Sequence, residues 1–408
     1  MSSRAEYRSC NPRAGVCAAV RGGAAAIEGA NWFSLREAGH DIRTDNLHRG
    51  AVACSFNQFP ECEEYLGGVV ASQPGTAESC IARFLLSWAN LRRGRSRQAL
   101  AHIDAISSLW RNPAASALHS LLRGLVDYPE LSVQKVASAV PYTMVDGTMF
   151  VPVTIGRMSS CFLLDSGATL SLISRNEAER LGMDISELRP DAARVYGATG
   201  GSLACSTALA ARLVIGECTL ENVAFIVLDD DPSQCGFPYR GALGLQVLAK
   251  LETVSCAWDG KLRIGFPAQD PKLVEANLCF DGPEPVVQTA FHGCSLPMVL
   301  DTGNSTTVLW PRFAKSFSKV LQASGTASSL VISGITGEST IPSVHLPLLQ
   351  LGVAARNIRL ENVHVLMHRT TPNSTWIMGR MGMDFLARTP WWAIDFKCMK
   401  LRTGEGVQ

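Results

Sequence analysis

Two Asp-Ser/Thr-Gly triplets are the residues of this chain whose types and spacing best suit chemistry. They occupy residues 165–167 and 301–303, and each follows an apolar run, FLL or MVL, that is typical of a buried strand. Each carboxylate should therefore lie at the end of a core strand, where a charge is costly unless it is paired or hydrogen-bonded. A single triplet usually caps its own turn, and roughly one chain of this length in six should contain one by chance. Two triplets at equivalent places in a repeat are a much stronger indication.

Further landmarks recur after each triplet in the same order and at similar spacing. A glycine-rich segment follows, YGATGG at 196–201 and SGITGE at 333–338. Next come ENVAFIVL or ENVHVLM, then an apolar run that ends in Gly244 or Gly382. A closing strand with one aspartate, AWDGKLRI or AIDFKCMKLR, completes each set. This order predicts a lobe of about 125 residues that occurs twice in the chain.

Two such lobes related by a pseudo-twofold axis would bring both triplets to that axis. The carboxylates of Asp165 and Asp301 would then lie about 3 Å apart, and like charges at that distance cannot both ionise. The pair would share one proton, which provides a general base and a general acid together. This arrangement can activate a water molecule for attack on an amide without a covalent enzyme intermediate.

The neighbours of the two aspartates fit the same chemistry. Gly167 and Gly303 have no side chain, so backbone N–H groups can approach the carboxylates. Ser166 and Thr302 carry hydroxyls that can bond across to the opposite lobe and brace the loops.

The two glycine-rich segments suit the tips of mobile hairpins that close over a substrate and exclude water. Gly197 and Gly334 would lie in these flaps, and Tyr196 could donate a hydrogen bond to a substrate. Ordinary β-turns are the alternative interpretation.

These motifs resemble those of the retropepsin-like (retroviral-type) aspartic peptidases of bacteria, over about residues 140–403. The shared pattern is two apolar residues, Asp-Ser/Thr-Gly, a glycine-bearing flap and an apolar-apolar-Gly run. The resemblance implies peptide-bond hydrolysis by Asp165 and Asp301, with Ser166 and Thr302 as loop-bracing hydroxyls and glycines in the flaps. The usual lobe of this family pairs with a second chain, whereas here the second lobe is in cis, as in pepsins.

The second lobe departs from the pattern in two places. Ala168, the common choice of the family, follows the first triplet, but Asn304 follows the second. Trp391 and Trp392 are extra aromatic residues near the end of the second lobe. The lobes have therefore diverged, which suits an asymmetric cleft.

The surrounding pattern predicts a mainly β protein preceded by a small α-helical region. Residues 1–70 have no clear period, so we expect irregular structure there. Residues 71–130 show helical spacing in pairs that resemble tetratricopeptide hairpins, with Gly94 as a stop and Ser96 as the cap of a helix reaching Trp110. These helices either pack on the catalytic body or recruit a protein partner. Short strands and turns then predict lobes over 141–268 and 280–403, beginning with a hairpin around Asp146-Gly147.

The composition is that of a well-packed globular protein. Of 408 residues 47% are apolar and 18% charged, and the net charge is +1. This balance argues against binding to nucleic acid, and no apolar stretch is long enough for a membrane span. Arg21 and Glu28 interrupt the Ala/Gly-rich start, so we expect no signal peptide. A cytoplasmic location is the default, and a periplasmic or secreted one follows if the start has been misread.

Alternative functions are a non-catalytic peptide binder or scaffold built on the same lobes, and metal chemistry. The second lobe contains His292, His345, His364 and His368, but the chain has neither an HExxH motif nor closely set cysteine pairs. We therefore expect no metal and no cofactor. The expected partner is a peptide or protein substrate, and the expected state is a monomer that contains an internal pseudo-dimer.

Overall fold

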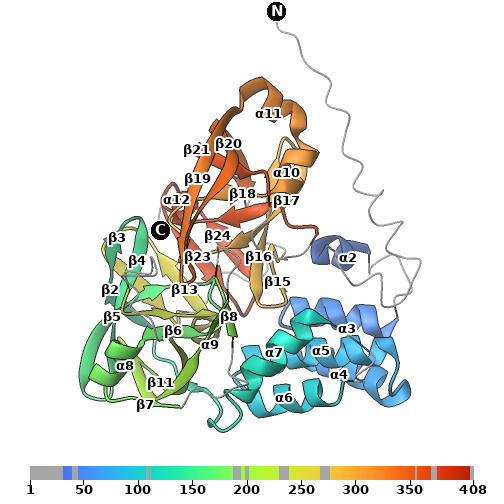
Figure 1. Cartoon of the computed structure of the whole chain (residues 1–408), viewed down its shortest axis with the longest axis vertical. Helices are drawn as coiled ribbons and strands as arrows, with labels where there is room; N and C mark the ends of the chain where they lie inside the picture. Colours follow the sequence, from blue (N-terminus) through green and yellow to red (C-terminus); the bar gives the residue numbers. More distant parts are fainter. Residues whose placement is uncertain are drawn as a thin grey trace, which may run out of the picture.

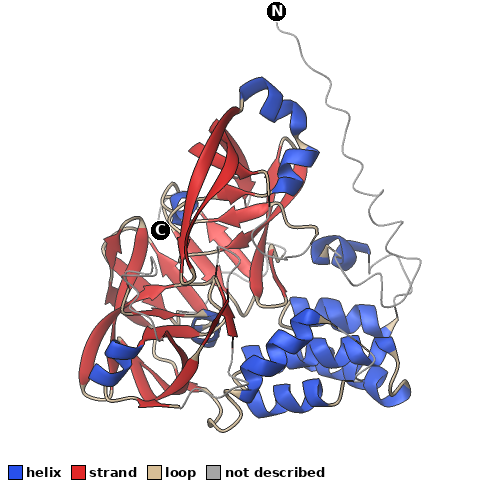
Figure 2. Ribbon diagram, in the orientation of Figure 1, coloured by secondary structure: helices blue, strands red, loops and turns tan. Residues whose placement is uncertain are grey.

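The computed structural model describes residues 31–38, 45–106, 110, 112–186, 194–197, 202–228, 239–266, 276–353, 356–368 and 375–404. Two β-rich lobes and a block of helices make up this part of the chain (Figures 1 and 2). The expected fold class, mainly β with two tandem lobes after a small helical region, is confirmed. Within the described residues, no helix is long and apolar enough to cross a membrane.

The helical block begins earlier than the sequence suggested. Its helices are α2 (Trp32–Ala38), α3 (Asn46–Ser55), α4 (Phe59–Ser72), α5 (Ala77–Arg92), α6 (Ser96–Asp104) and α7 (Pro113–Arg123). The expectation of irregular structure up to residue 70 was therefore wrong for α2, α3 and α4, whereas residues 1–30 and 39–44 lie outside the described part. Asp45 caps α3 by accepting the His48 N–H, and the buried face of α3 consists mainly of small residues. Because alanine, glycine and cysteine are only weakly hydrophobic, the helical periodicity of this segment is weak, and the helix was not predicted from the sequence.

The predicted helices after residue 71 are present, with one changed boundary. Thr76 caps α5, and Gly94 follows its end with a φ of 75°, as its role as a stop predicted. Ser96, however, is the first residue of α6 and does not cap it, and the helix ends at Asp104, before Trp110. The likeness to tetratricopeptide hairpins stays a prediction.

The first lobe is a large sheet in which strands distant in sequence lie side by side. The Asp146-Gly147 turn joins its first hairpin, and both residues have positive φ angles, 48° and 80°, as a two-residue hairpin turn requires. The sheet order is β1-β11-β6-β12-β5-β4-β10-β7, with β3 on β4. Its elements are β1 (Ser132–Gln134), β3 (Thr143–Val145), β4 (Thr148–Ile155), β5 (Met158–Leu164), β6 (Ser171–Ser174), α8 (Arg175–Arg180), β7 (Asp184–Ile185), β10 (Ser206–Ile215), β11 (Cys218–Leu228), β12 (Gly241–Leu243) and α9 (Leu245–Leu251), beside a separate hairpin, β8 (Arg194–Tyr196) and β9 (Ser202–Ala204).

The second lobe repeats this plan around the strand that carries the second triplet. Its sheet order is β15-β16-β17-β22-β18-β21-β20-β19. The elements are β15 (Leu278–Asp281), β16 (Glu284–Phe291), β17 (Cys294–Leu300), β18 (Val308–Leu309), α10 (Pro311–Ser316), α11 (Ser318–Ser324), β19 (Thr326–Gly334), β20 (Gly337–Val353), β21 (Arg356–Leu366), β22 (Gly379–Met381) and α12 (Met383–Leu386).

A third sheet joins the lobes. Its order is β2-β14-β13-β23-β24, from β2 (Ser138–Pro141), β13 (Thr253–Cys256), β14 (Lys261–Ile264), β23 (Trp392–Asp395) and β24 (Lys400–Thr403). The antiparallel β13–β23 pair crosses from one lobe to the other, so main-chain hydrogen bonds hold the lobes together. Trp392, one of the extra tryptophans, is fully buried in this sheet. Asp395 ends β23, whereas Asp259 lies in the turn between β13 and β14.

The helical block packs against both lobes. Gln246 of the first lobe donates to the Leu91 carbonyl at 3.0 Å. The Arg92 guanidinium donates to the Gly282 carbonyl of the second lobe at 3.2 Å and to the Cys54 carbonyl inside the block at 2.7 Å. Trp32 donates its indole N–H to Asp281 at 2.9 Å. These contacts make the helices part of the body that carries the site.

Candidate active site

Equivalent strands deliver the two aspartates of the triplets. Asp165 follows β5 and its N–H donates to the Leu243 carbonyl on β12, while Asp301 follows β17 and its N–H donates to the Met381 carbonyl on β22. Both distances are 3.0 Å. Since β12 and β22 run parallel to β5 and β17, each aspartate is fixed at the end of a buried strand pair.

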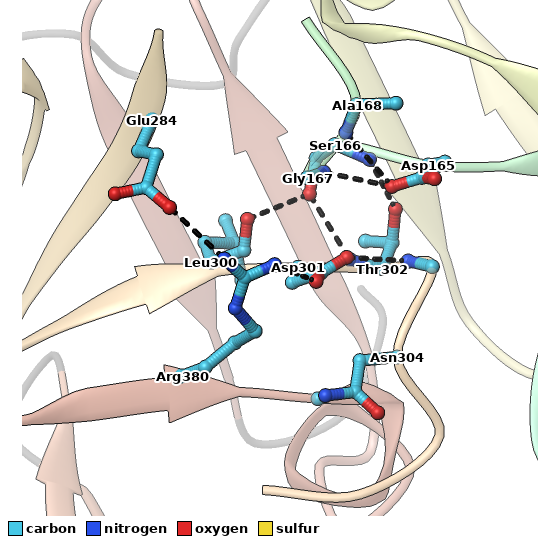
Figure 3. A network of polar contacts seen from close by, with 12 residues as sticks. Asp165, Ser166, Gly167, Ala168, Glu284, Leu300, Asp301, Thr302, Asn304 and Arg380 are labelled. Carbon is cyan, nitrogen blue, oxygen red and sulfur yellow. Dashed lines mark hydrogen bonds and ion pairs between the residues drawn. The ribbon is translucent and has the colours of Figure 1, made fainter. Parts of the chain in front are cut away.

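The serine and threonine of the triplets bond across the interface between the lobes (Figure 3). Ser166 Oγ donates to the Leu300 carbonyl at 2.8 Å and accepts the Thr302 N–H at 3.0 Å. Thr302 Oγ1 donates to the Leu164 carbonyl at 2.7 Å and accepts the Ser166 N–H at 3.0 Å. All four groups are buried, so each hydroxyl has its partners without competition from water.

Replacement of Thr302 by valine should destabilise the chain by about 2–4 kcal/mol. The valine methyl leaves the buried Ser166 N–H and Leu164 carbonyl without their partner. Denaturant unfolding measures the loss. Thr306→Val is the matched control, because Thr306 is exposed. Equal stability of both variants would show that the cross-lobe bonds contribute nothing.

Each carboxylate faces the glycine of the opposite triplet. A Cβ added to Gly303 would lie 2.4 Å from Asp165 Cγ, and one added to Gly167 would lie 2.5 Å from Asp301 Cγ. Each glycine therefore leaves the space that the other lobe's carboxyl occupies. Each carboxylate also accepts a hydrogen bond from the backbone N–H of the glycine in its own triplet. Gly167 donates to Asp165 Oδ1 and Gly303 donates to Asp301 Oδ1, both at 2.9 Å.

The residues after the triplets are not equivalent. The Ala168 N–H adds a second hydrogen bond to Asp165 Oδ1 at 3.0 Å, whereas the Asn304 N–H donates to the main-chain carbonyl of Asp301. Further along, however, Ser171 and Thr307 do the same work, because their hydroxyls accept the N–H groups of Gly244 and Gly382. The two lobes therefore differ at Asn304 but agree in these later hydrogen bonds.

The pKa of Asp165 is raised to about 7. Desolvation is the main cause, and the negative charge of Asp301 adds to it. The Gly167 and Ala168 N–H groups and the Arg380 charge act in the opposite direction. A carboxyl that remains protonated up to neutral pH beside a second carboxyl is the arrangement that acid–base catalysis by a pair requires.

Arg380 and Glu284 belong to this site and were missed in the sequence. Arg380, on β22, donates to Asp301 Oδ2 at 2.6 Å and to Glu284 Oε1 at 2.9 Å (Figure 3). A signal did exist, because GRMG at 379–382 stands where the first lobe has GALG at 241–244. A charged residue inside a buried apolar run is unusual enough to have been noticed.

The two glycine-rich segments approach each other at Gly197 and Thr336. A Cβ on Gly197, directly after β8, would lie 2.1 Å from Thr336 Oγ1, in the turn between β19 and β20. Gly334 ends β19 opposite Gly337, and Ile335 beside it is buried. Tyr196 ends β8, but its side chain and residues 198–201 lie outside the described part. We call the β8–β9 and β19–β20 hairpins the first and second flap.

Two of the four histidines of the metal alternative have hydrogen-bond partners within the second lobe. His345 bonds Asn362 at 3.1 Å and His364 bonds Ser343 at 2.9 Å, both across the β20–β21 pair. Protein groups therefore already use these imidazoles.

A two-lobed fold in which each lobe places one Asp-Ser/Thr-Gly triplet on a common interface defines an aspartic-protease architecture. The model of the aspartyl protease family matches the chain twice, over residues 151–247 and 287–385, once in each lobe. The chain therefore has two lobes in tandem, each of which is similar to the aspartyl protease family.

Solved structures include 188 chains that match this protein. One is the crystal structure of a retropepsin-like aspartic protease from Rickettsia conorii, with 19% identity and a TM-score of 0.26, covering 33% of this chain and 95% of its own. A search of curated proteins found no match.

Proposed function

We propose that this chain is an aspartic endopeptidase in which Asp165 and Asp301 activate a water molecule between them. The observation that carries the proposal is the reciprocal packing at the interface of the lobes. Each carboxylate lies against the glycine of the opposite triplet, and the Ser166 and Thr302 hydroxyls hold both loops.

The arrangement supplies the groups that uncatalysed amide hydrolysis lacks. One carboxylate takes a proton from the water, and the other, protonated, gives its proton to the substrate carbonyl oxygen. The raised pKa of Asp165 supports a dyad that keeps one proton under mildly acidic conditions. The close approach of the two flaps at Gly197 and Thr336 supports a role in which they part for a peptide and close over it.

The remaining parts of the proposal concern partners. A peptide or protein is the expected substrate, and the cross-lobe contacts within one chain support activity as a monomer. The helical block packs on the lobes, which favours a structural role. Recruitment of a protein partner by this block stays a prediction. The alternative function, a non-catalytic peptide binder or scaffold built on the same two lobes, also stays a prediction.

The test is digestion of a mixed peptide library from pH 3 to 7 by the wild type and by Asp301→Asn. Cleavage by the wild type and at least a hundredfold loss in the variant are expected, because half of the dyad cannot ionise. Binding without cleavage by the wild type would identify a non-catalytic binder. Cleavage that survives in Asp301→Asn, or that a chelator stops, would overturn the proposal.

A further inference from the structure

The ion pair on Asp301 makes the two halves of the dyad chemically different. Arg380 holds Asp301 and Glu284 at the same time, and all three side chains are largely shielded, with exposures of 24%, 8% and 17%. Because these charges are shielded from water and joined by short hydrogen bonds, they attract each other strongly. Dissolved salt weakens this attraction only a little.

Strand register shows that the first lobe lacks this ion pair. Arg380 pairs with Val299, two residues before Asp301, and Ala242 pairs with Leu163, two residues before Asp165. By the same comparison through β16 and β4, Glu284 corresponds to Thr148. The positions that carry two charges in the second lobe therefore carry alanine and threonine in the first.

The hydrogen bonds of the two carboxyls favour different protonation states. Asp301 accepts the Gly303 N–H on Oδ1 and the Arg380 guanidinium on Oδ2, so a proton on Oδ2 would displace a charged donor. The N–H groups of Gly167 and Ala168 both end on Asp165 Oδ1, so Oδ2 can hold a proton without displacing either.

We infer that Arg380, held in place by Glu284, keeps the negative charge on Asp301 and the shared proton on Asp165. This inference rests on the proposed peptidase function. It makes Asp301 the base, Asp165 the acid and Arg380 a positioning residue.

The assigned roles give a balanced reaction. Asp301 takes a proton from water as the water oxygen bonds to the carbonyl carbon, and Asp165 gives its proton to the carbonyl oxygen, which yields a neutral geminal diol. The C–N bond then breaks as the nitrogen accepts the proton from Asp301, and one diol hydroxyl returns a proton to Asp165. The products are a carboxylic acid and an amine, and the dyad regains its starting state.

The inference predicts a shift of the pH profile. The charged groups that act here from the surrounding elements are Asp165 after β5, Asp301 after β17, Arg380 on β22 and Glu284 on β16. The Arg380 charge lowers the pKa of Asp165. In Arg380→Met the alkaline limb of kcat/KM should therefore move to higher pH, by about one unit.

The experiment measures kcat/KM against pH for the wild type, Arg380→Met, Arg380→Lys and the control Arg388→Met. Lysine keeps the charge and should restore most of the wild-type profile, and Arg388, an exposed residue of the same lobe, should leave it unchanged. If Arg380→Met does not fold, Arg380→Gln keeps a hydrogen-bond donor without the charge, and the same shift is expected.

The two proposals fail in different ways. A wild type that cleaves no peptide, or an active Asp301→Asn, refutes the peptidase proposal. If the wild type is active and a folded Arg380→Met or Arg380→Gln has the same pH profile, only the inference about Arg380 is refuted. An arginine with a merely structural role would change the rate but would not move the alkaline limb of the profile.

Discussion

Replacement of Asp165 by asparagine should abolish peptide hydrolysis and, above about pH 7, make the chain more stable than the wild type. In the folded chain the pKa of Asp165 is about 7, against 3.8 for an ordinary aspartate, mainly because of burial. A group whose folded pKa is raised contributes stability that is complete below pH 4 and is lost as the pH rises through 7. Asparagine does not ionise, so it escapes this loss while its carbonyl oxygen can still accept the Gly167 and Ala168 N–H groups.

The size of the effect follows from the difference between the two pKa values. It corresponds to at most about 4 kcal/mol over the whole pH range, and about 2–3 kcal/mol of this should fall between pH 5 and pH 8, because part of the stability is already lost at pH 5. Denaturant unfolding gives the free energy of unfolding of Asp165→Asn and of the wild type at pH 5 and at pH 8. The effect is the change, between the two pH values, in the difference between these free energies.

Asp259 provides a control of opposite sign. Its hydrogen bond and ion pair with Arg263 lower the pKa of this exposed carboxyl to about 2, so its contribution is present above pH 4 and is lost as the pH falls through 2. Asp259→Asn should therefore bring no gain at pH 8. A constant difference between Asp165→Asn and the wild type at pH 5 and 8 would mean that Asp165 titrates normally.

Replacement of Gly303 by alanine should reduce hydrolysis at least about a hundredfold, with little change in fold. The new Cβ would lie 2.4 Å from Asp165 Cγ and 2.5 Å from Asp165 Oδ1, distances that no real contact reaches. Asp165 cannot turn away cheaply because two N–H groups hold its carboxylate. The carboxyls must therefore move apart, and the shared proton and the water lose their geometry.

Gly352→Ala is the matched control for this substitution. Gly352 lies on β20 of the same lobe, and its added Cβ would meet Asn357 and Ala290 at 3.4 Å and 3.5 Å, close to ordinary contact. Initial rates and circular dichroism of both variants separate loss of chemistry from loss of fold. Wild-type rates in Gly303→Ala would show that the two triplets do not face each other in solution.

The sequence predicted those parts of the site that local patterns encode. An apolar run before Asp-Ser/Thr-Gly defines a strand end, and Asp146-Gly147 defines a two-residue turn, because each depends on neighbours along the chain. The repeat then implied the pairing of the lobes.

The missed features depend on contacts between distant residues. Arg380 reaches Asp301 only because β22 lies beside β17, and Glu284 joins them from β16. The contact of Gly197 with Thr336 likewise joins residues of the two lobes. Helix α3 was missed for a different reason, since its small residues give a weak period although they pack well.

The sheet that joins the lobes has a consequence for how the site depends on dilution. Two separate chains that build a shared site come apart as their concentration falls, and their activity falls with them. Here β13 pairs with β23 of the same polypeptide. Each lobe therefore meets the other at an effective concentration that the connecting chain sets, of millimolar order for a short flexible connection. Scarcity of the protein leaves that local concentration unchanged.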